Sequence, residues 1–192
     1  MSHDIPTKAQ ATRARTARAT SADGPTVDAP TLYDADILLW SEQQAAVIRA
    51  LGHRRDLPND LDIANVAEEI ESVGRSELAT VKSQIRQILL HQMKLAIEPQ
   101  SDAVRHWEGE IVTFHSELVD RYAPSMAQRI DIDAIWRSAR DSMRRSTRGT
   151  QSAAFSAGLP ETSPFGLDDL LGERIDPALL AARLQAPPSA PA

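Results

Sequence analysis

The chain contains no cysteine among its 192 residues. This absence excludes disulfide bonds, cysteine-held iron–sulfur clusters and zinc sites built from thiolates. No apolar run approaches the roughly 20 residues that a membrane-spanning helix needs. The first 30 residues also lack the apolar segment of a secretory signal peptide. We therefore predict a cytoplasmic protein that does not insert into a membrane.

Aromatic residues are scarce as well, at 4%, although 42% of the chain is hydrophobic. Short aliphatic side chains must therefore fill the core, which favours helix-on-helix packing over sheets rich in β-branched and aromatic residues. The chain also lacks a basic excess, because its formal net charge is −6. Since folds that bind nucleic acid are usually basic, we do not expect nucleic acid as a partner.

Length and pattern divide the chain into one domain and two tails. A chain of this size has room for one ordinary domain. The first thirty residues carry Ala, Thr, Pro, Asp and Arg without helical periodicity, and the last seven read APPSAPA. We predict a disordered N-terminal tail over 1–30, a single helical domain over 31–184 and a flexible C-terminal tail over 185–192.

Apolar residues recur at three- and four-residue steps in four long segments, which predicts four main helices in an antiparallel bundle. The first helix begins near Asp34 or Asp36 and ends at Gly52, where we expect a left-handed cap. Further helices, three long and two short, are predicted at 63–97, 102–122, 131–148, 168–171 and 177–184.

The segment 63–97 contains no proline and is the longest of these. Gly74 interrupts it and marks a kink, a close helix crossing or a break into two helices. Near its end, apolar residues cover almost every direction of the helix. These residues are Leu89, Leu90, Met93, Leu95, Ala96 and Ile97. A helix that is apolar all round is either buried in its own domain or shared with a partner, and both alternatives stay open.

Several strings of the sequence resemble a known family. They are Tyr33-Asp34-x-Asp36-x-x-x-Trp40, Glu68-Glu69-Ile70-Glu71, Gly74-Arg75-Ser76-Glu77, Leu89-Leu90-His91-Gln92-Met93-Lys94, Trp107, and Gly158-Leu159-Pro160-Glu161 with Pro164. Over about residues 31–180 the chain is similar to the bacterial family called domain of unknown function number twenty-nine. The resemblance implies a compact helical fold in a bacterium and implies no activity.

Glu69, Glu77 and His91 are the candidate catalytic residues. Helical bundles build metal and acid–base sites from facing Glu and His side chains, so these three could converge with Glu110 or His115. The Glu-x-x-His spacing of di-iron bundles and the His-Glu-x-x-His zinc motif are both absent from the sequence. The identity of any metal or cofactor is therefore unknown, and whether the protein is an enzyme stays open.

Glu77 and His91 also have a purely structural interpretation. At 100° per residue, Glu77 lies between Ile70 and Val81 in the apolar arc of the long segment, where an unpaired carboxylate is costly. Arg105 in the following helix is the expected ion-pair partner. His91 would then form a hydrogen bond inside the bundle.

Basic residues are concentrated only in the segment 131–148. They are Arg137, Arg140, Arg144, Arg145 and Arg148. Because no aromatic residues are interleaved with them, they are more typical of a solvated helix end that complements the helix dipole than of a nucleic-acid surface.

These features predict an all-α protein, a compact antiparallel bundle of about four main helices with a long central helix. The leading hypothesis is a binding or scaffold module that contacts a protein partner or a second copy of itself. The alternative is a metal-assisted or acid–base hydrolase with a site around Glu69, Glu77 and His91.

Overall fold

A computed structural model describes residues 31–185, and every regular element in that part of the chain is helical. The predicted disordered tail over 1–30 and the predicted flexible end from residue 186 onward lie outside the described residues. Residue Gln185 corrects the predicted tail boundary by one position, because it closes the last helix and donates a hydrogen bond to the Ala96 carbonyl (3.0 Å).

The elements confirm an all-α fold with a long central helix. In chain order they are α1 Leu32–Ala35, α2 Ile37–Leu51, α3 Ile63–Ile97, α4 Val104–Arg121, the 3-10 helix η1 Pro124–Arg129, α5 Ile132–Ser146, α6 Ala153–Gly158, α7 Leu167–Leu171 and α8 Pro177–Gln185. The sequence pattern does not predict the short elements α1, η1 and α6.

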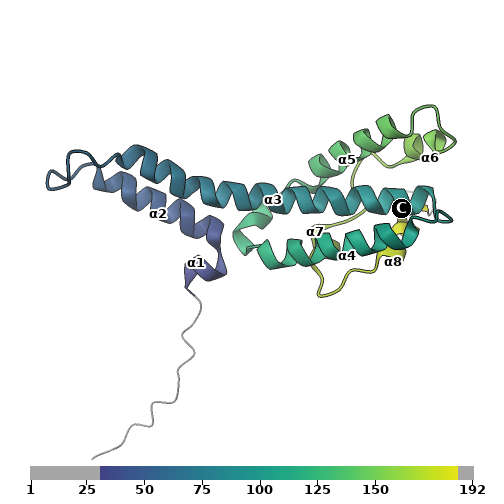
Figure 1. The fold of residues 1–192 in the computed structure, drawn as a ribbon, viewed down its shortest axis with the longest axis horizontal. Coiled ribbons are helices and arrows are strands. Elements are labelled where there is room, and N and C mark those ends of the chain that lie inside the picture. The colour runs from purple at the N-terminus through teal and green to yellow at the C-terminus, as the bar shows by residue number, and fades with distance from the viewer. Residues whose placement is uncertain (1–30, 186–192) are drawn as a thin grey trace, which may run out of the picture.

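The long helix α3 is shared by two parts of the molecule (Figure 1). α2 packs on the N-terminal half of α3, whereas α4, α5 and α8 pack on its C-terminal half. The α2–α3 hairpin therefore extends beyond the other helices as a two-helix arm. We define the arm as residues 37–76, because Glu77 is the first residue of α3 with an ion pair to α4.

Aspartate side chains cap the N-termini of α2, α3, α5 and α8, the last through Asp176, which accepts from the Leu179 N–H (3.0 Å). Asp36, Asp62 and Asp131 accept hydrogen bonds from the N–H groups of Leu39 (3.0 Å), Asn65 (3.1 Å) and Ala134 (2.9 Å). The expected left-handed cap at Gly52 is wrong. Its φ is −58°, because its N–H continues a tight right-handed turn to the Arg49 carbonyl (3.1 Å).

The core surrounds the C-terminal half of α3. Leu89, Met93, Leu95 and Ala96 are at most 5% exposed, because α4, α5 and α8 surround this part of the helix. Of the two alternatives for the all-round apolar end of α3, burial within the domain is therefore the one observed. Within residues 31–185, no helix is both long and apolar enough to cross a membrane.

Gly74 lies where α2 crosses α3 closely, and α3 is neither broken nor interrupted there. A Cβ atom built on Gly74 would be 2.2 Å from Ser41 Oγ and 3.0 Å from Leu38 Cα. Both contacts are with the buried face of α2. Of the three alternatives for this glycine, the close helix crossing is therefore the one observed.

Asp36 fixes the base of the arm to the bundle. Its carboxylate accepts hydrogen bonds from the Ser125 N–H (2.9 Å), the Ser125 hydroxyl (2.7 Å) and the Leu39 N–H (3.0 Å). Burial by itself raises the pKa of this carboxyl, but these hydrogen bonds outweigh burial and lower the pKa of Asp36 below its ordinary value. The ionised form of Asp36 therefore stabilises the fold.

Gly74→Ala is expected to lower the free energy of unfolding by about 1–3 kcal/mol, because the new methyl group must push the α2 backbone away from α3. Better helix propensity offsets at most about 1 kcal/mol of this loss. Gly109→Ala in α4 is the matched control, because its Cβ would meet no heavy atom within 4 Å. Urea unfolding measures both variants, and equal stabilities would contradict the close crossing.

Asp36→Asn is expected to cost about 1–3 kcal/mol of unfolding free energy at pH 7, because the neutral amide loses charge-assisted hydrogen bonds. Because the folded-state pKa is lowered, this contribution is complete above the unfolded-state pKa of about 4 and is lost as pH falls through the folded-state value. The stability difference from wild type should therefore shrink below about pH 4.

Denaturant unfolding at pH 7 and pH 3 measures this difference. Asp102→Asn is the control, because Asp102 is exposed on the surface. A cost of Asp36→Asn that is the same at both pH values would show that the ionised carboxylate is not its source.

Candidate functional site

The arm carries an apolar stripe that the rest of the described chain leaves partly open to solvent. Val66 and Val73 are 39% and 44% exposed, and Ile63 and Ile70 are half-buried beside them. We call these four side chains the open seam. Their spacing of three and four residues places them in one line along α3.

The open seam continues the line along which α3 binds α4. Residues of α3 at seven-residue steps contact α4 in an antiparallel register. The pairs are Glu77–Arg121 (3.0 Å), Gln84–Glu117 and His91–Glu110 (2.6 Å). Two more steps toward the N-terminus lead to Ile70 and Ile63, but α4 ends at Arg121. The open seam is thus the continuation of a helix-binding surface beyond the end of its helix.

The two flanks of the arm differ in how their charges are paired. On one flank, Arg49 and Arg75 form ion pairs with Glu68 and Glu71, and the hydrogen bond from Arg49 lowers the pKa of Glu71. On the other flank, beside the open seam, Glu69 is exposed and has no ion pair with any residue of 31–185. Residues 37–76 contain seven acidic side chains and four arginines, so the arm has excess negative charge.

His91 lies in a buried polar cluster between α3 and α4. Its Nδ1 is 2.8 Å from the Gln87 carbonyl, and its Nε2 is 2.6 Å from a Glu110 oxygen and 3.1 Å from Lys94 Nζ. Because a carbonyl can only accept, Nδ1 carries a proton and donates it. Nε2 then faces both the Glu110 carboxylate and the Lys94 ammonium group, so the imidazole ring is held in one orientation.

The rim of this cluster reaches the surface. His106 Nε2 is 3.6 Å from the same Glu110 oxygen, and Lys94 Nζ lies 5.8 Å from the centre of the Trp107 ring. A depression of about 210 Å³ adjoins Lys94 and Trp107 and is also lined by Thr150 of the segment after α5. A small molecule could therefore reach the outer edge of the cluster.

Among the candidate catalytic residues, only His91 contacts an expected partner, which is Glu110. Glu77 and Glu69 precede it by 14 and 22 residues on one unbroken helix. At 1.5 Å per residue they lie about 21 Å and 33 Å away, so α3 does not bring the three together. Within residues 31–185, no group of three or more His, Asp or Glu side chains is placed to hold a metal ion. A catalytic role of these residues stays a prediction.

Glu77 forms an ion pair, but with Arg121 (3.0 Å) and not with the expected Arg105. Because α3 and α4 are antiparallel, the last turn of α4 lies beside Glu77. Arg105 is in the first turn of α4, at the opposite end of the helix, where it is exposed. The sequence predicts that Glu77 needs an ion-pair partner, whereas the register between α3 and α4 decides which arginine is that partner.

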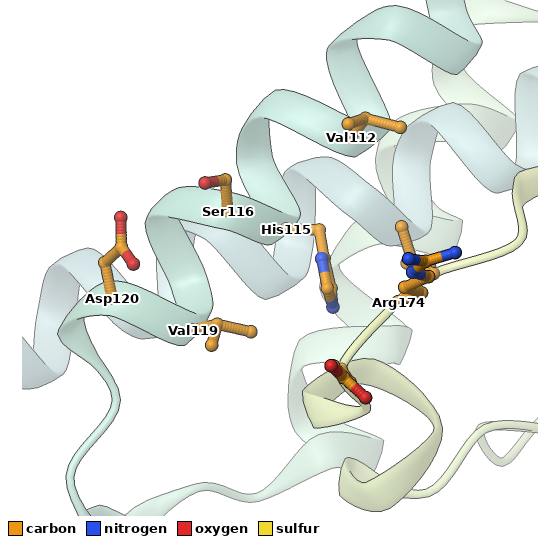
Figure 2. A pocket seen from close by; sticks show the side chains of 8 residues that line it. Val112, His115, Ser116, Val119, Asp120 and Arg174 are labelled. Carbon is orange, nitrogen blue, oxygen red and sulfur yellow. The ribbon is translucent and has the colours of Figure 1, made fainter.

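Figure 2 shows a second depression, of about 380 Å³, between α4 and the segment that follows α7. His115, Ser116 and Asp120 line it from α4, and Arg174 lines it from the other side. The Nε2 of the buried His115 donates to the Gly172 carbonyl (3.0 Å). His115 therefore attaches the C-terminal segment to α4. The sequence suggests His115 only as part of a metal or acid–base site and does not predict this structural role.

Two arginines of α5 have a similar anchoring role. Arg140 is buried, donates to the Pro160 carbonyl (3.1 Å) and forms an ion pair with Glu161 (2.9 Å). Arg144 donates to the Ser156 carbonyl (3.1 Å). The expected solvated helix end is therefore wrong for these two side chains, because they satisfy carbonyl groups of the segment that follows α5. The exposed arginines of this set are Arg137, Arg145 and Arg148.

Comparison with known proteins identifies the family of this chain. The family model described as domain of unknown function DUF29 matches residues 32–175. A comparison with curated proteins gives no match. Among solved structures, the chain is similar to an alpha-helical protein of unknown function from Rhodospirillum rubrum ATCC 11170. The two are 37% identical with a TM-score of 0.73 over 82% of this chain and 100% of that one. The chain therefore belongs to the DUF29 family, as its sequence strings predict.

Proposed function

We propose that the protein is a binding module that recognises another protein through the open seam of its arm. The observation that supports this proposal is the exposure of Val66 and Val73 beside Ile63 and Ile70, which continue the line of α3 that binds α4. A single exposed valine needs no explanation, but a row of apolar side chains at helical spacing is the pattern of a helix-binding groove.

The energetics favour a partner at this position. Fully burying a valine side chain stabilises a complex by about 1.5 kcal/mol, and these two valines are still more than one third exposed. The arm is also the thinnest part of the fold, because α2 is the main helix that packs against the N-terminal half of α3. A third helix over the seam would supply the apolar contacts that α4 supplies to the rest of α3.

The double variant Val66→Lys with Val73→Lys is expected to abolish partner binding. Both side chains are exposed, so the substitutions should change the unfolding free energy by no more than about 0.5 kcal/mol each. The measurement is affinity purification of the tagged full-length protein from its native host, with quantitative mass spectrometry. A protein recovered in stoichiometric amount with wild type should be lost with the double variant.

Val112→Lys with Val119→Lys in α4 is the matched control. These valines are 52% and 41% exposed and are also seven residues apart, but they lie outside the arm. If the α4 control variant loses the partner and the arm variant keeps it, the binding surface lies on α4 and not on the arm. Equal recovery with wild type and both variants would contradict the proposal.

A second candidate function is metal-assisted or acid–base hydrolysis, and the contact between His91 and Glu110 is the observation that favours it. If a metal binds there, its presence at 100 times its dissociation constant should stabilise the native state by about 2.7 kcal/mol. Glu110→Gln should remove that stabilisation. Thermal unfolding with Mg²⁺, Mn²⁺ and Zn²⁺ measures it, and an unchanged transition with all three would eliminate the metal-assisted version.

A further inference from the structure

We propose that the partner presents a basic amphipathic helix, which lies along the open seam of the arm. This inference rests on the proposed function and adds the chemical class of the partner. It follows from three properties of the arm: the shape of the seam, the charge beside it and the poor fit of a second copy.

The shape of the seam fits one helix of about three turns. Residues 63–73 of α3 extend over about 15 Å, which corresponds to about eleven residues, or three turns, of a paired helix. On α2, which packs against this half of α3, Ile48 and Leu51 are also half-buried. A helix with apolar side chains at positions i, i+3, i+7 and i+10 would pack against both α2 and α3, as calmodulin-type helix-in-groove complexes do.

The charge beside the seam specifies a basic helix. Glu69 and the cap residue Asp62 are exposed, and neither has an ion pair within residues 31–185. α4 supplies a precedent on the same line, because its last residue, Arg121, forms an ion pair with Glu77. A helix bound along the seam would therefore meet these carboxylates, which lysine or arginine would neutralise.

A second copy of this chain fits the seam poorly. An antiparallel pair of identical seams centred near residue 68 would bring the two Glu69 carboxylates close to the two-fold axis. Like charges opposed at an interface are costly, so this arrangement is disfavoured. The arm has too few arginines to offset this repulsion, since Arg49 and Arg75 already bind Glu68 and Glu71.

The small size of the seam indicates a weak complex. Stable interfaces usually bury at least about 1,200 Å², and a three-turn helix buries less. We therefore expect a dissociation constant on the order of 10–100 μM, with a strong salt dependence because the flanking contacts are ionic.

The experiment uses two fluorescein-labelled synthetic helical peptides and the full-length protein. Both peptides have leucine and isoleucine at the seam-facing positions and alanine elsewhere, and they differ only in lysine or glutamate at the flanking positions. Fluorescence anisotropy at low and physiological salt measures their affinities. The lysine peptide is expected to bind wild type at least tenfold more tightly than the glutamate peptide, and Glu69→Lys should abolish or reverse this preference.

Glu173→Lys is the matched control, because it makes the same charge change at an exposed residue outside the arm. It should leave the tenfold preference intact. Equal binding of the lysine peptide to wild type and Glu69→Lys, or no binding of that peptide at 1 mM, would overturn the basic-helix inference.

Other outcomes separate this inference from the proposed function. If the glutamate peptide binds more tightly than the lysine peptide, and the double variant Val66→Lys with Val73→Lys abolishes that binding, the inference of a basic partner is wrong. The proposed binding surface is then still supported. If sedimentation velocity shows a dimer that this double variant dissociates, a second copy is the occupant and the inference also fails. If the double variant binds the lysine peptide as wild type does, both the inference and the proposed binding surface fail.

Discussion

The structure depends on the difference in length between α3 and α4. α3 has 35 residues and is about 52 Å long, whereas α4 has 18 residues and covers about 27 Å of it. An antiparallel bundle built on α3 must therefore end before α3 does. The N-terminal half of α3 is left with α2 as its main neighbour, and both the arm and its partly exposed apolar line result from this difference.

Two local contacts keep such a thin arm in one position. The close crossing at Gly74 lets α2 approach α3 at the level of Leu38 and Ser41. The hydrogen bonds between Asp36 and Ser125 join the start of α2 to η1, and an ion pair between Glu42 and Arg129 (2.8 Å) reinforces the same joint. The arm is therefore stabilised at its crossing and at its base, while the surface beside Glu69 stays accessible.

Local features of the sequence predicted most of the fold. Amphipathic periodicity and aspartate caps located the main helices, because both are determined by residues within one or two turns. Register between helices was not predictable in this way. The pairing of Glu77 with Arg121 and the burial of Arg140 against Pro160 depend on how distant elements meet. For the same reason the contact between His91 and Glu110 was one of several open alternatives, whereas the exposure of Val66 and Val73 depended on where α4 ends.

The continuity of α3 also has a consequence for how the protein unfolds. One helix supplies backbone hydrogen bonds to both the arm and the bundle, with no loop between the two parts. Melting α3 at Gly74 would break contacts on both sides at once, so the arm and bundle should behave as one cooperative unit. A ligand held near the tip of the arm would then slow amide hydrogen exchange around Leu89, about 39 Å along α3 from Ile63, without touching that region.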